Sequence, residues 1–342
     1  MIEEPEGTDT EEGIGRALTT VGDTIGDLVT GIPAPIRKNA TKAFAHLCTA
    51  AVEYPVALIE GAIAEKRAGS RARVKLIDTS ANQIAEQMKI NPEYARAAAT
   101  KYAHKIIRER VNIDQISEIA ATDLKSKPFV NKDNKDAEVP PICEDWLNAF
   151  ESEAAQMSSE QMQLLFGKIL AGEIRRPMSF SIKTIKLMAQ LDNRAAKLFR
   201  LLCSLSISLR ITNSKIILDA RVVSLGGNAG SNSLQAYGLS LDGLNTLQEY
   251  GLIISDYNSY MDYQIAVVHK DRITVPITYQ NTEWALVPKV EPPEFREFRL
   301  NGVGFSRSGK ELLPIVDIEP KVQYTTALKN FFEQRGMTMT GT

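Results

Sequence analysis

The residues that come closest to a catalytic motif form the run Gly304-Phe-Ser-Arg-Ser-Gly309-Lys310. This run matches the first seven positions of the P-loop, a glycine-rich turn whose backbone N–H groups and lysine hold the phosphates of a nucleotide. The eighth position of that motif needs Ser or Thr to bind Mg²⁺, and here it is Glu311. The preceding residues 299–303 also make a poor buried strand. We therefore predict a turn that enters a helix, without nucleotide binding or hydrolysis.

Residues that usually bind metal ions are scattered along the chain. The three histidines are far apart in the sequence: His46, His104 and His269. No HExxH motif is present, and Cys and His are not paired at the spacing of a zinc site. A G-x-S-x-G motif, which would place a nucleophilic serine, is missing as well. The sequence therefore predicts that the protein is not an enzyme and binds neither a metal ion nor a cofactor.

The composition is that of an ordinary folded protein. The 342 residues are 44% hydrophobic and 24% charged, and the net charge of −2 gives no chain-wide attraction to nucleic acid or anionic lipid. The cysteines Cys48, Cys143 and Cys203 are odd in number and far apart, which is typical of free thiols in a reducing compartment. The acidic first twelve residues lack the regions of a secretory signal. We therefore expect a cytoplasmic location.

An apolar seam near the amino terminus has the spacing of an amphipathic helix. Its residues are separated alternately by four and three positions, and the candidate contact residues are Ile14, Leu18, Val21, Ile25 and Leu28. Glycines at positions 15, 22 and 26 each cost roughly 1 kcal/mol relative to alanine inside a helix. The seam therefore needs a cover, which we expect to be another subunit, a partner protein or lipid.

Two clusters of basic residues follow. The first comes after an apolar stretch and consists of Lys66, Arg67, Arg71, Arg73 and Lys75. An apolar helix that ends in cations is typical of a peripheral anchor on an anionic membrane surface, although a solvated helix face gives the same pattern. The second cluster consists of Lys101, Lys105, Arg108 and Arg110, and its simplest interpretation is again a solvated helix face.

The periodicity predicts an α+β protein that is predominantly α. We expect a disordered acidic tail over residues 1–12, a helical amino-terminal region over 13–125, a linker over 126–141 and an α+β domain over 142–342. Within the helical region, Asn91 and Pro92 predict a helix start. That helix carries an expected face made of Tyr94, Ala98, Tyr102 and Ile106.

The carboxyl-terminal domain begins with a compact helical unit. Ser158, Ser181 and Asp192 are the expected N-caps of its later helices, and Gly172 is the expected C-cap of the helix between the first two. A short helix over 240–250 followed by a β-hairpin gives a winged-helix-like arrangement. Because residues 240–250 contain no Lys or Arg, we do not expect this helix to bind DNA.

Residues 164–191 read LLFGKILAGEIRRPMSFSIKTIKLMAQL. This segment, with the Trp-containing helix before it and the Leu-rich helix after it, resembles the bacterial family called domain of unknown function 2806. Met178 stands where the family pattern has Gly. The resemblance implies a bacterial intracellular protein with no established reaction and a place in accessory or antiviral-defence gene neighbourhoods. At the helix corner, Glu173, Arg175 and Arg176 predict an ion-pair set or a partner contact.

These observations favour a non-enzymatic interaction or sensing protein. The expected partners are a partner protein or a second copy of the chain, or an anionic membrane surface, reached through residues 13–75. The location would then be cytoplasmic, with peripheral contact at the inner membrane. The alternative is a winged-helix-type regulator that binds nucleic acid, although the charge distribution makes nucleic acid an unexpected partner.

Overall fold

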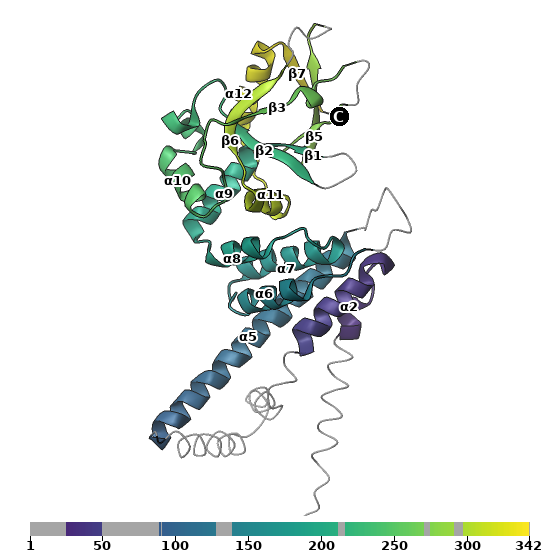
Figure 1. The fold of residues 1–342 in the computed structure, drawn as a ribbon, viewed down its shortest axis with the longest axis vertical. Helices are drawn as coiled ribbons and strands as arrows, with labels where there is room; N and C mark the ends of the chain where they lie inside the picture. The colour runs from purple at the N-terminus through teal and green to yellow at the C-terminus, as the bar shows by residue number, and fades with distance from the viewer. Residues whose placement is uncertain are drawn as a thin grey trace, which may run out of the picture. The chain divides into compact units, whose positions relative to one another are not determined.

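The computed structural model of the protein describes residues 25–49, 89, 91–127, 139–210, 216–269, 274–290 and 297–341. These residues form two compact units (Figure 1). The first unit holds the described residues up to Ser179 and is helical, and the second holds those from Phe180 onward and combines helices with an antiparallel sheet. The predicted α+β class, predominantly α, is confirmed.

The first unit is built around one long helix. Residues 25–29 are helical, and the named helices are α2 (Ala34–Thr49), α5 (Pro92–Ser126), α6 (Glu144–Ala154) and α7 (Glu160–Arg175). The start of α5 is the one predicted: the Asn91 side chain accepts a hydrogen bond from the N–H of Glu93 at 2.8 Å, and proline occupies the first turn.

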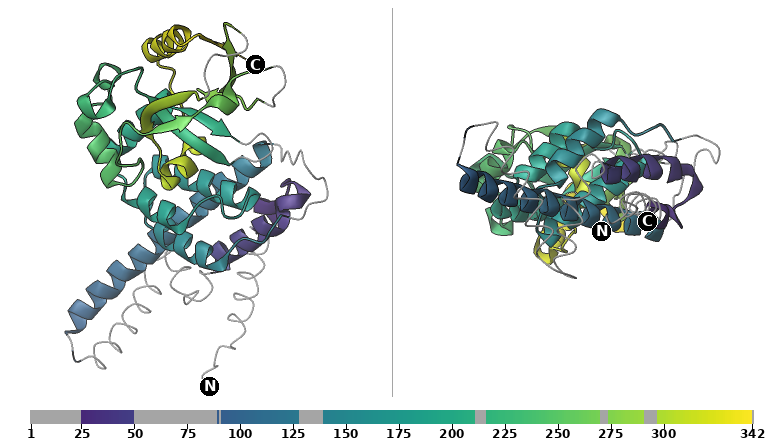
Figure 2. Two further views of the ribbon diagram at one scale, coloured as in Figure 1. Left: turned by 45° about the horizontal axis from the view of Figure 1, so that its top comes forward. Right: turned by 90° about the horizontal axis from the view of Figure 1, so that it is seen from below.

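The carboxyl-terminal half of α5 forms the core of this unit. Figure 2 shows α2 alongside that half, and α6 and α7 pack against it as well. Ile116 and Leu124 are fully buried there. On α7, a β carbon added to Gly167 would lie 2.4 Å from Cγ2 of Ile119, so this close approach of two helices requires glycine.

This packing corrects the predicted domain boundary. The expected linker 126–141 does not separate the two units, because α6 and α7 belong with α5 and the division falls between Ser179 and Phe180. A charged, proline-flanked segment shows where the chain leaves regular structure. It does not show which helices bury their apolar faces together.

Two predicted helix ends also differ from the structure. The side chain of Ser159, not Ser158, caps α7 by accepting a hydrogen bond from the N–H of Met162. The same helix continues past Gly172 to Arg175, because Ile174 is fully buried and keeps the last turn against the core. The predicted caps Ser181 and Asp192 are confirmed.

The second unit contains the remaining elements. Its helices are α8 (Ile182–Gln190), α9 (Asn193–Leu205), α10 (Leu241–Glu249), α11 (Arg307–Leu312) and α12 (Val322–Gln334). Its strands are β1 (Ile207–Arg210), β2 (Ile217–Val223), β3 (Tyr260–Asp262), β4 (Ile277–Tyr279), β5 (Thr282–Pro288), β6 (Arg299–Gly304) and β7 (Met337–Gly341). The described strands form one sheet in the order β3-β6-β2-β1-β4-β5-β7, with antiparallel neighbours throughout.

The strand pairing corrects the winged-helix-like prediction. The segment after α10 does not form a hairpin with the next strand. Instead, Ile253 bridges Phe305, and β3 pairs with β6 so that Tyr260 lies opposite Asn301. A local hydrophobic pattern cannot identify a partner this far along the chain, because pairing depends on which edge buries the apolar face.

Strand β6 also corrects the expectation that residues 299–303 make a poor strand. It lies between β3 and β2, with Leu300 and Val303 buried. A β carbon on Gly302 would lie 2.0 Å from the carbonyl oxygen of Val222, so glycine is what permits the tight pairing. The helix α12 is fastened to the same sheet, because the buried Tyr324 hydroxyl donates to the carbonyl of Val223 at 2.9 Å.

Candidate functional site

Most of the predicted amino-terminal contact residues lie outside the described residues. These are Ile14, Leu18 and Val21 of the apolar seam, and Lys66, Arg67, Arg71, Arg73 and Lys75 of the first basic cluster. Ile25 and Leu28 lie in the described helical segment and are half-buried. The role of the seam and of the first basic cluster stays a prediction.

Glu173, Arg175 and Arg176 lie at the end of α7, and each has different surroundings. Arg175 forms its ion pair with Asp123 of α5 and also donates to the backbone oxygen of Asp123. Glu173 is buried, and its Oε1 accepts a hydrogen bond from the N–H of Met178 at 2.6 Å. Arg176 is exposed at the C-cap of α7. Arg175 therefore takes its ion-pair partner from α5, and a partner contact of these three residues stays a prediction.

Asp123 is the electrostatic centre of this corner. Burial raises the pKa of its carboxyl group, but hydrogen bonds and charge from Lys127 and Arg175 outweigh burial, and the pKa is lowered from its usual value. The carboxylate therefore stays ionised between its two cations. This arrangement holds α7 to α5.

Met178 occupies a left-handed backbone conformation with φ of 69°. Its side chain is 80% exposed, so packing does not compensate the strain that a β carbon creates in this region. The family resemblance leads us to expect glycine at this position, and the turn is kept here by the hydrogen bond from the Met178 N–H to Glu173. Methionine in place of glycine at position 178 therefore costs local backbone strain and does not change the fold.

The P-loop-like run has a structural explanation for its charged residues. Oε2 of Glu311 accepts hydrogen bonds from the Ser181 N–H at 2.7 Å and from the Thr184 hydroxyl at 2.6 Å. The Lys310 ammonium donates to the carbonyl of Leu218 at 3.3 Å. A β carbon on Gly309 would lie 2.1 Å from the carbonyl oxygen of Leu252. Glycine, lysine and glutamate at these positions each fit an internal contact of the second unit.

The buried ion pair of the sheet is likewise satisfied. Arg221 donates to Asp219 at 2.6 Å and to the backbone carbonyls of Ser259 and Leu300. The Tyr263 hydroxyl donates to the same carboxylate at 2.8 Å. Burial, together with the negative charge of Asp219, raises the pKa of Tyr263 well above its usual value, so the phenol keeps its proton. The cluster ties β2 to the strand β6 and leaves no reactive group exposed.

Within the ranges that the structure describes, no three His, Cys, Asp or Glu side chains are grouped so that they could hold a metal ion. None of the described helices combines the length and the apolar content that crossing a membrane requires.

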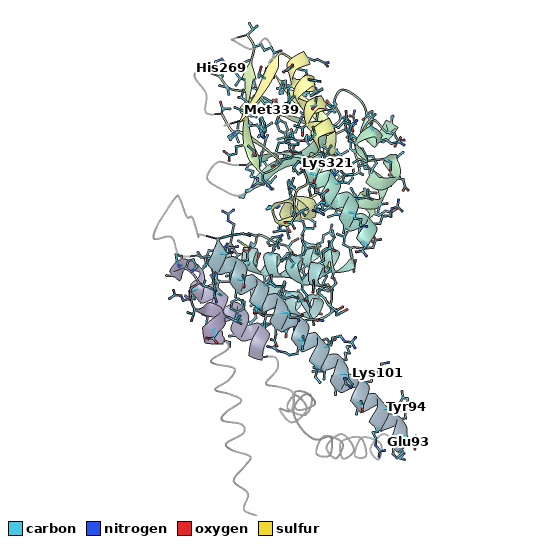
Figure 3. The ribbon with its side chains drawn as sticks, turned by 180° about the vertical axis from the view of Figure 1, so that it is seen from behind. Glu93, Tyr94, Lys101, His269, Lys321 and Met339 are labelled. Carbon is cyan, nitrogen blue, oxygen red and sulfur yellow. The ribbon has the colours of Figure 1, made fainter. Side chains whose placement is uncertain are left out.

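The amino-terminal half of α5, residues 92–111, carries many exposed side chains. The part that carries Glu93, Tyr94 and Lys101 lies away from the other described helices of the unit (Figure 3). Tyr94 is 68% exposed and Tyr102 is 57% exposed. The expected helical face with these two tyrosines therefore does not pack into the core. Apart from Ala95, the buried residues of α5 lie in its carboxyl-terminal half, from Asn112 onward.

Charged side chains share this open surface with a tyrosine. Tyr94, Lys101 and Arg108 are spaced seven residues apart, which is close to two helical turns, and Lys105 lies one turn after Lys101. We call these four residues the basic face of α5. Lys105 pairs with Glu109 at 3.6 Å, whereas Lys101 and Arg108 form no ion pair within the described part of the chain. The seven-residue spacing of tyrosine and cations is visible in the sequence and could have identified this face.

The family comparison agrees with the resemblance found in residues 164–191. Residues 96–329, well over half of the chain, match the family model described as "Protein of unknown function (DUF2806)". Neither the curated proteins nor the solved structures contain a match to this sequence. The matched region begins within α5 and ends within α12, so it leaves out α2 but includes α6, α7 and most of the second unit. The chain belongs to the DUF2806 family.

Proposed function

We propose that the protein acts by binding, as an interaction or sensing component without catalysis of its own, and that the basic face of α5 is its contact surface for an acidic partner protein. The observation that carries this proposal is the exposure of Tyr94 on the same helix face as Lys101 and Arg108, two cations that form no ion pair within the described residues. Tyrosine and arginine are enriched among the residues that dominate the energetics of protein interfaces.

The geometry suits a groove or a flat acidic surface on the partner. From Tyr94 to Arg108 the helix rises about 21 Å, at ~1.5 Å per residue. Residues 92–111 contain five Lys or Arg residues and two Glu residues, so this half-helix carries a positive excess. Complementary negative charge on a partner would speed association and fix the register of the helix against it.

Two other partner classes fit the same face less well. A membrane-bound helix needs a continuous apolar face, and the basic face offers one tyrosine among three cations. Nucleic acid would meet few cations here, and the net charge of the whole chain is −2. In α10, the helix of the winged-helix-like alternative, there is no Lys or Arg.

Charge reversal tests the proposal. The full-length protein carrying Lys101→Glu, Lys105→Glu and Arg108→Glu is cross-linked in the cells that naturally produce it, treated with nuclease and purified. We expect the proteins recovered with the wild type to be depleted at least tenfold with this variant, and recovery to fall as salt rises. The matched control reverses three lysines of the second unit, namely the exposed Lys197 and Lys289 and the half-buried Lys321, which pairs with Glu319.

The control should retain the partner proteins, because its charge change is equal and lies elsewhere. Unchanged recovery with the α5 variant would overturn the proposal. Loss of the recovered material on nuclease treatment alone would favour the nucleic-acid alternative.

Residues 13–75 supply a second proposed contact, through self-association or an anionic membrane surface. With this contact, the protein would reside in the cytoplasm and touch the inner membrane peripherally. The family resemblance implies that it would act in antiviral defence. Deleting residues 1–32 should abolish self-association or co-sedimentation with anionic vesicles. Vesicle binding should weaken steeply with salt, whereas an apolar subunit interface should persist. A truncated protein that sediments like the full-length chain would contradict this contact.

A further inference from the structure

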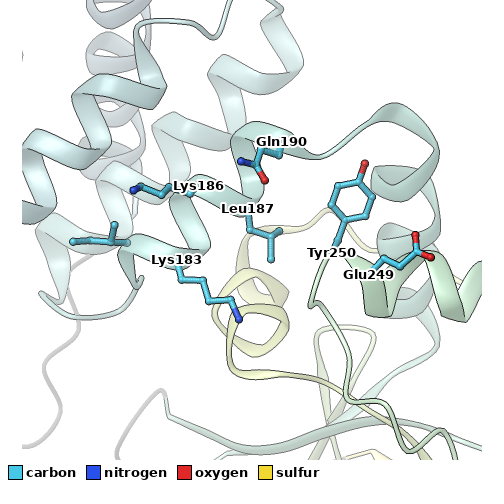
Figure 4. A pocket seen from close by; sticks show the side chains of 7 residues that line it. Lys183, Lys186, Leu187, Gln190, Glu249 and Tyr250 are labelled. Carbon is cyan, nitrogen blue, oxygen red and sulfur yellow. The ribbon is translucent and has the colours of Figure 1, made fainter.

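The second unit contains a groove between α8 and the carboxyl end of α10. The groove has a volume of about 660 Å³, which lies within the range of small-molecule sites. Its lining residues are Ile182, Lys183, Lys186, Leu187, Gln190, Glu249 and Tyr250 (Figure 4). The α8 residues among them are spaced so that they occupy one side of that helix. We propose that this groove binds a small organic phosphate.

Two lysines of the groove are the reason for proposing a phosphate group in the ligand. Lys183 and Lys186 are exposed, and within the described residues neither forms an ion pair or a hydrogen bond, although the carboxylate of Glu249 lines the same groove. A lysine ammonium is a compact charge that commonly binds phosphate. Two such charges one helical turn apart favour a doubly charged oxyanion over a singly charged one.

The wall opposite α8 is suited to the organic part of the ligand. The hydroxyl of Tyr250 donates to Oδ2 of Asp192 at 3.0 Å, and Oδ1 of Asp192 caps α9 by accepting from the N–H of Ala195 at 2.7 Å. The hydrogen bond to Asp192 raises the pKa of Tyr250, so the phenol stays neutral. The tyrosine ring is thereby held in place at the groove. Leu187, on the α8 wall, also lines the groove but is almost fully buried.

The P-loop-like run fastens both walls of the groove. Glu311 caps α8 through Ser181 and Thr184, as described above. On the other side, the Ser306 hydroxyl donates to the carbonyl of Gly251, the residue that follows Tyr250, at 2.5 Å. A single segment therefore sets the separation of α8 from the end of α10. In this proposal the P-loop-like run supports the walls of the phosphate site, and its own residues do not line the groove.

Calorimetric titration of the full-length protein tests the inference. The probes are phenyl phosphate, which combines a ring with a phosphate, inorganic phosphate, and benzoate as a singly charged ring anion. We expect saturable binding of phenyl phosphate, with inorganic phosphate and benzoate each binding at least tenfold more weakly. The variant with Lys183→Gln and Lys186→Gln should lose at least tenfold in affinity for phenyl phosphate.

The matched control is Lys197→Gln, an exposed lysine of α9 outside the groove. It should bind phenyl phosphate like the wild type, and equal thermal transitions of all three proteins would show that folding is intact. The inference is overturned if the wild type shows no saturable binding, if the double variant binds equally well, or if benzoate matches phenyl phosphate. Because the groove and the basic face of α5 lie in different units, none of these results bears on the proposed partner contact.

Discussion

The carboxylate of Glu311 accepts a hydrogen bond from the fully buried hydroxyl of Thr184 at 2.6 Å. The residue that stands at the Mg²⁺-ligand position of a P-loop pattern thus holds the first turn of α8. Its other oxygen is bonded to Arg307 at 2.8 Å, so both oxygens of the carboxylate have partners inside the second unit. The run therefore resembles a phosphate-binding motif in sequence, but in the structure its Glu311 serves as a hydrogen-bond acceptor for α8.

Replacing Glu311 should destabilise the second unit. In Glu311→Ala, the Ser181 N–H and the Thr184 hydroxyl lose a charged acceptor, which costs about 1–3 kcal/mol for partly buried groups. Urea unfolding of the full-length protein measures the loss. The control is Glu333→Ala in α12, whose exposed carboxylate forms no ion pair within the described residues, and it should leave stability nearly unchanged.

The variant Glu311→Ser completes the eight-residue P-loop pattern. We expect it to be destabilised like Glu311→Ala and to gain no Mg²⁺-dependent binding of ATP, because β6 belongs to an antiparallel sheet. Calorimetry with ATP and Mg²⁺ checks this. Micromolar binding that disappears in a further Lys310→Ala change would show that the run is a nucleotide site.

Gly167→Ala should loosen the contact between α7 and α5. The added β carbon would overlap Ile119, and such overpacking typically costs 1–3 kcal/mol. The matched variant is Gly26→Ala in the same unit, where the β carbon would meet nothing within 4 Å. Because alanine favours a helix over glycine, Gly26→Ala should keep or raise stability. Equal effects of the two variants in thermal unfolding would contradict the described packing.

Met178→Gly should stabilise the first unit by roughly 1 kcal/mol. Glycine adopts the left-handed conformation without the steric cost of a β carbon, and the exposed methionine side chain gives up little packing. Met178→Ala keeps the β carbon and should show no such gain. If alanine and glycine raise the unfolding midpoint equally, strain at this position is not the cause.

The free energy of unfolding should decrease in acid because Asp123 becomes protonated and loses its ion pairs. Its pKa is lower in the folded protein than in the unfolded chain, so its contribution is fully present above the unfolded value of about 4. The contribution is lost as the pH falls through the lowered folded pKa. Urea unfolding at several pH values should show a wild-type advantage over Asp123→Asn that is constant above about pH 5 and shrinks below about pH 4. A difference that stays constant down to pH 3 would argue against the ion pair with Arg175.

Some features of the two candidate surfaces can be predicted from the local sequence, and others depend on tertiary packing. The seven-residue spacing of Tyr94, Lys101 and Arg108 can be read in the sequence. Their exposure cannot, because it depends on where α2, α6 and α7 pack along α5. The groove of the second unit gave no sequence signal beyond the pair Lys183 and Lys186, since its other wall comes from α10.

The sequence by itself determined the helix starts at Asn91, Ser181 and Asp192, because a cap is a hydrogen bond between a side chain and an N–H two or three residues away. It also determined the family and the α+β class. Only the tertiary structure decided that β3 pairs with β6, that Arg175 pairs with Asp123, and that Glu311 caps α8. These contacts join residues far apart in the chain, and they form where burial of apolar faces brings such segments together.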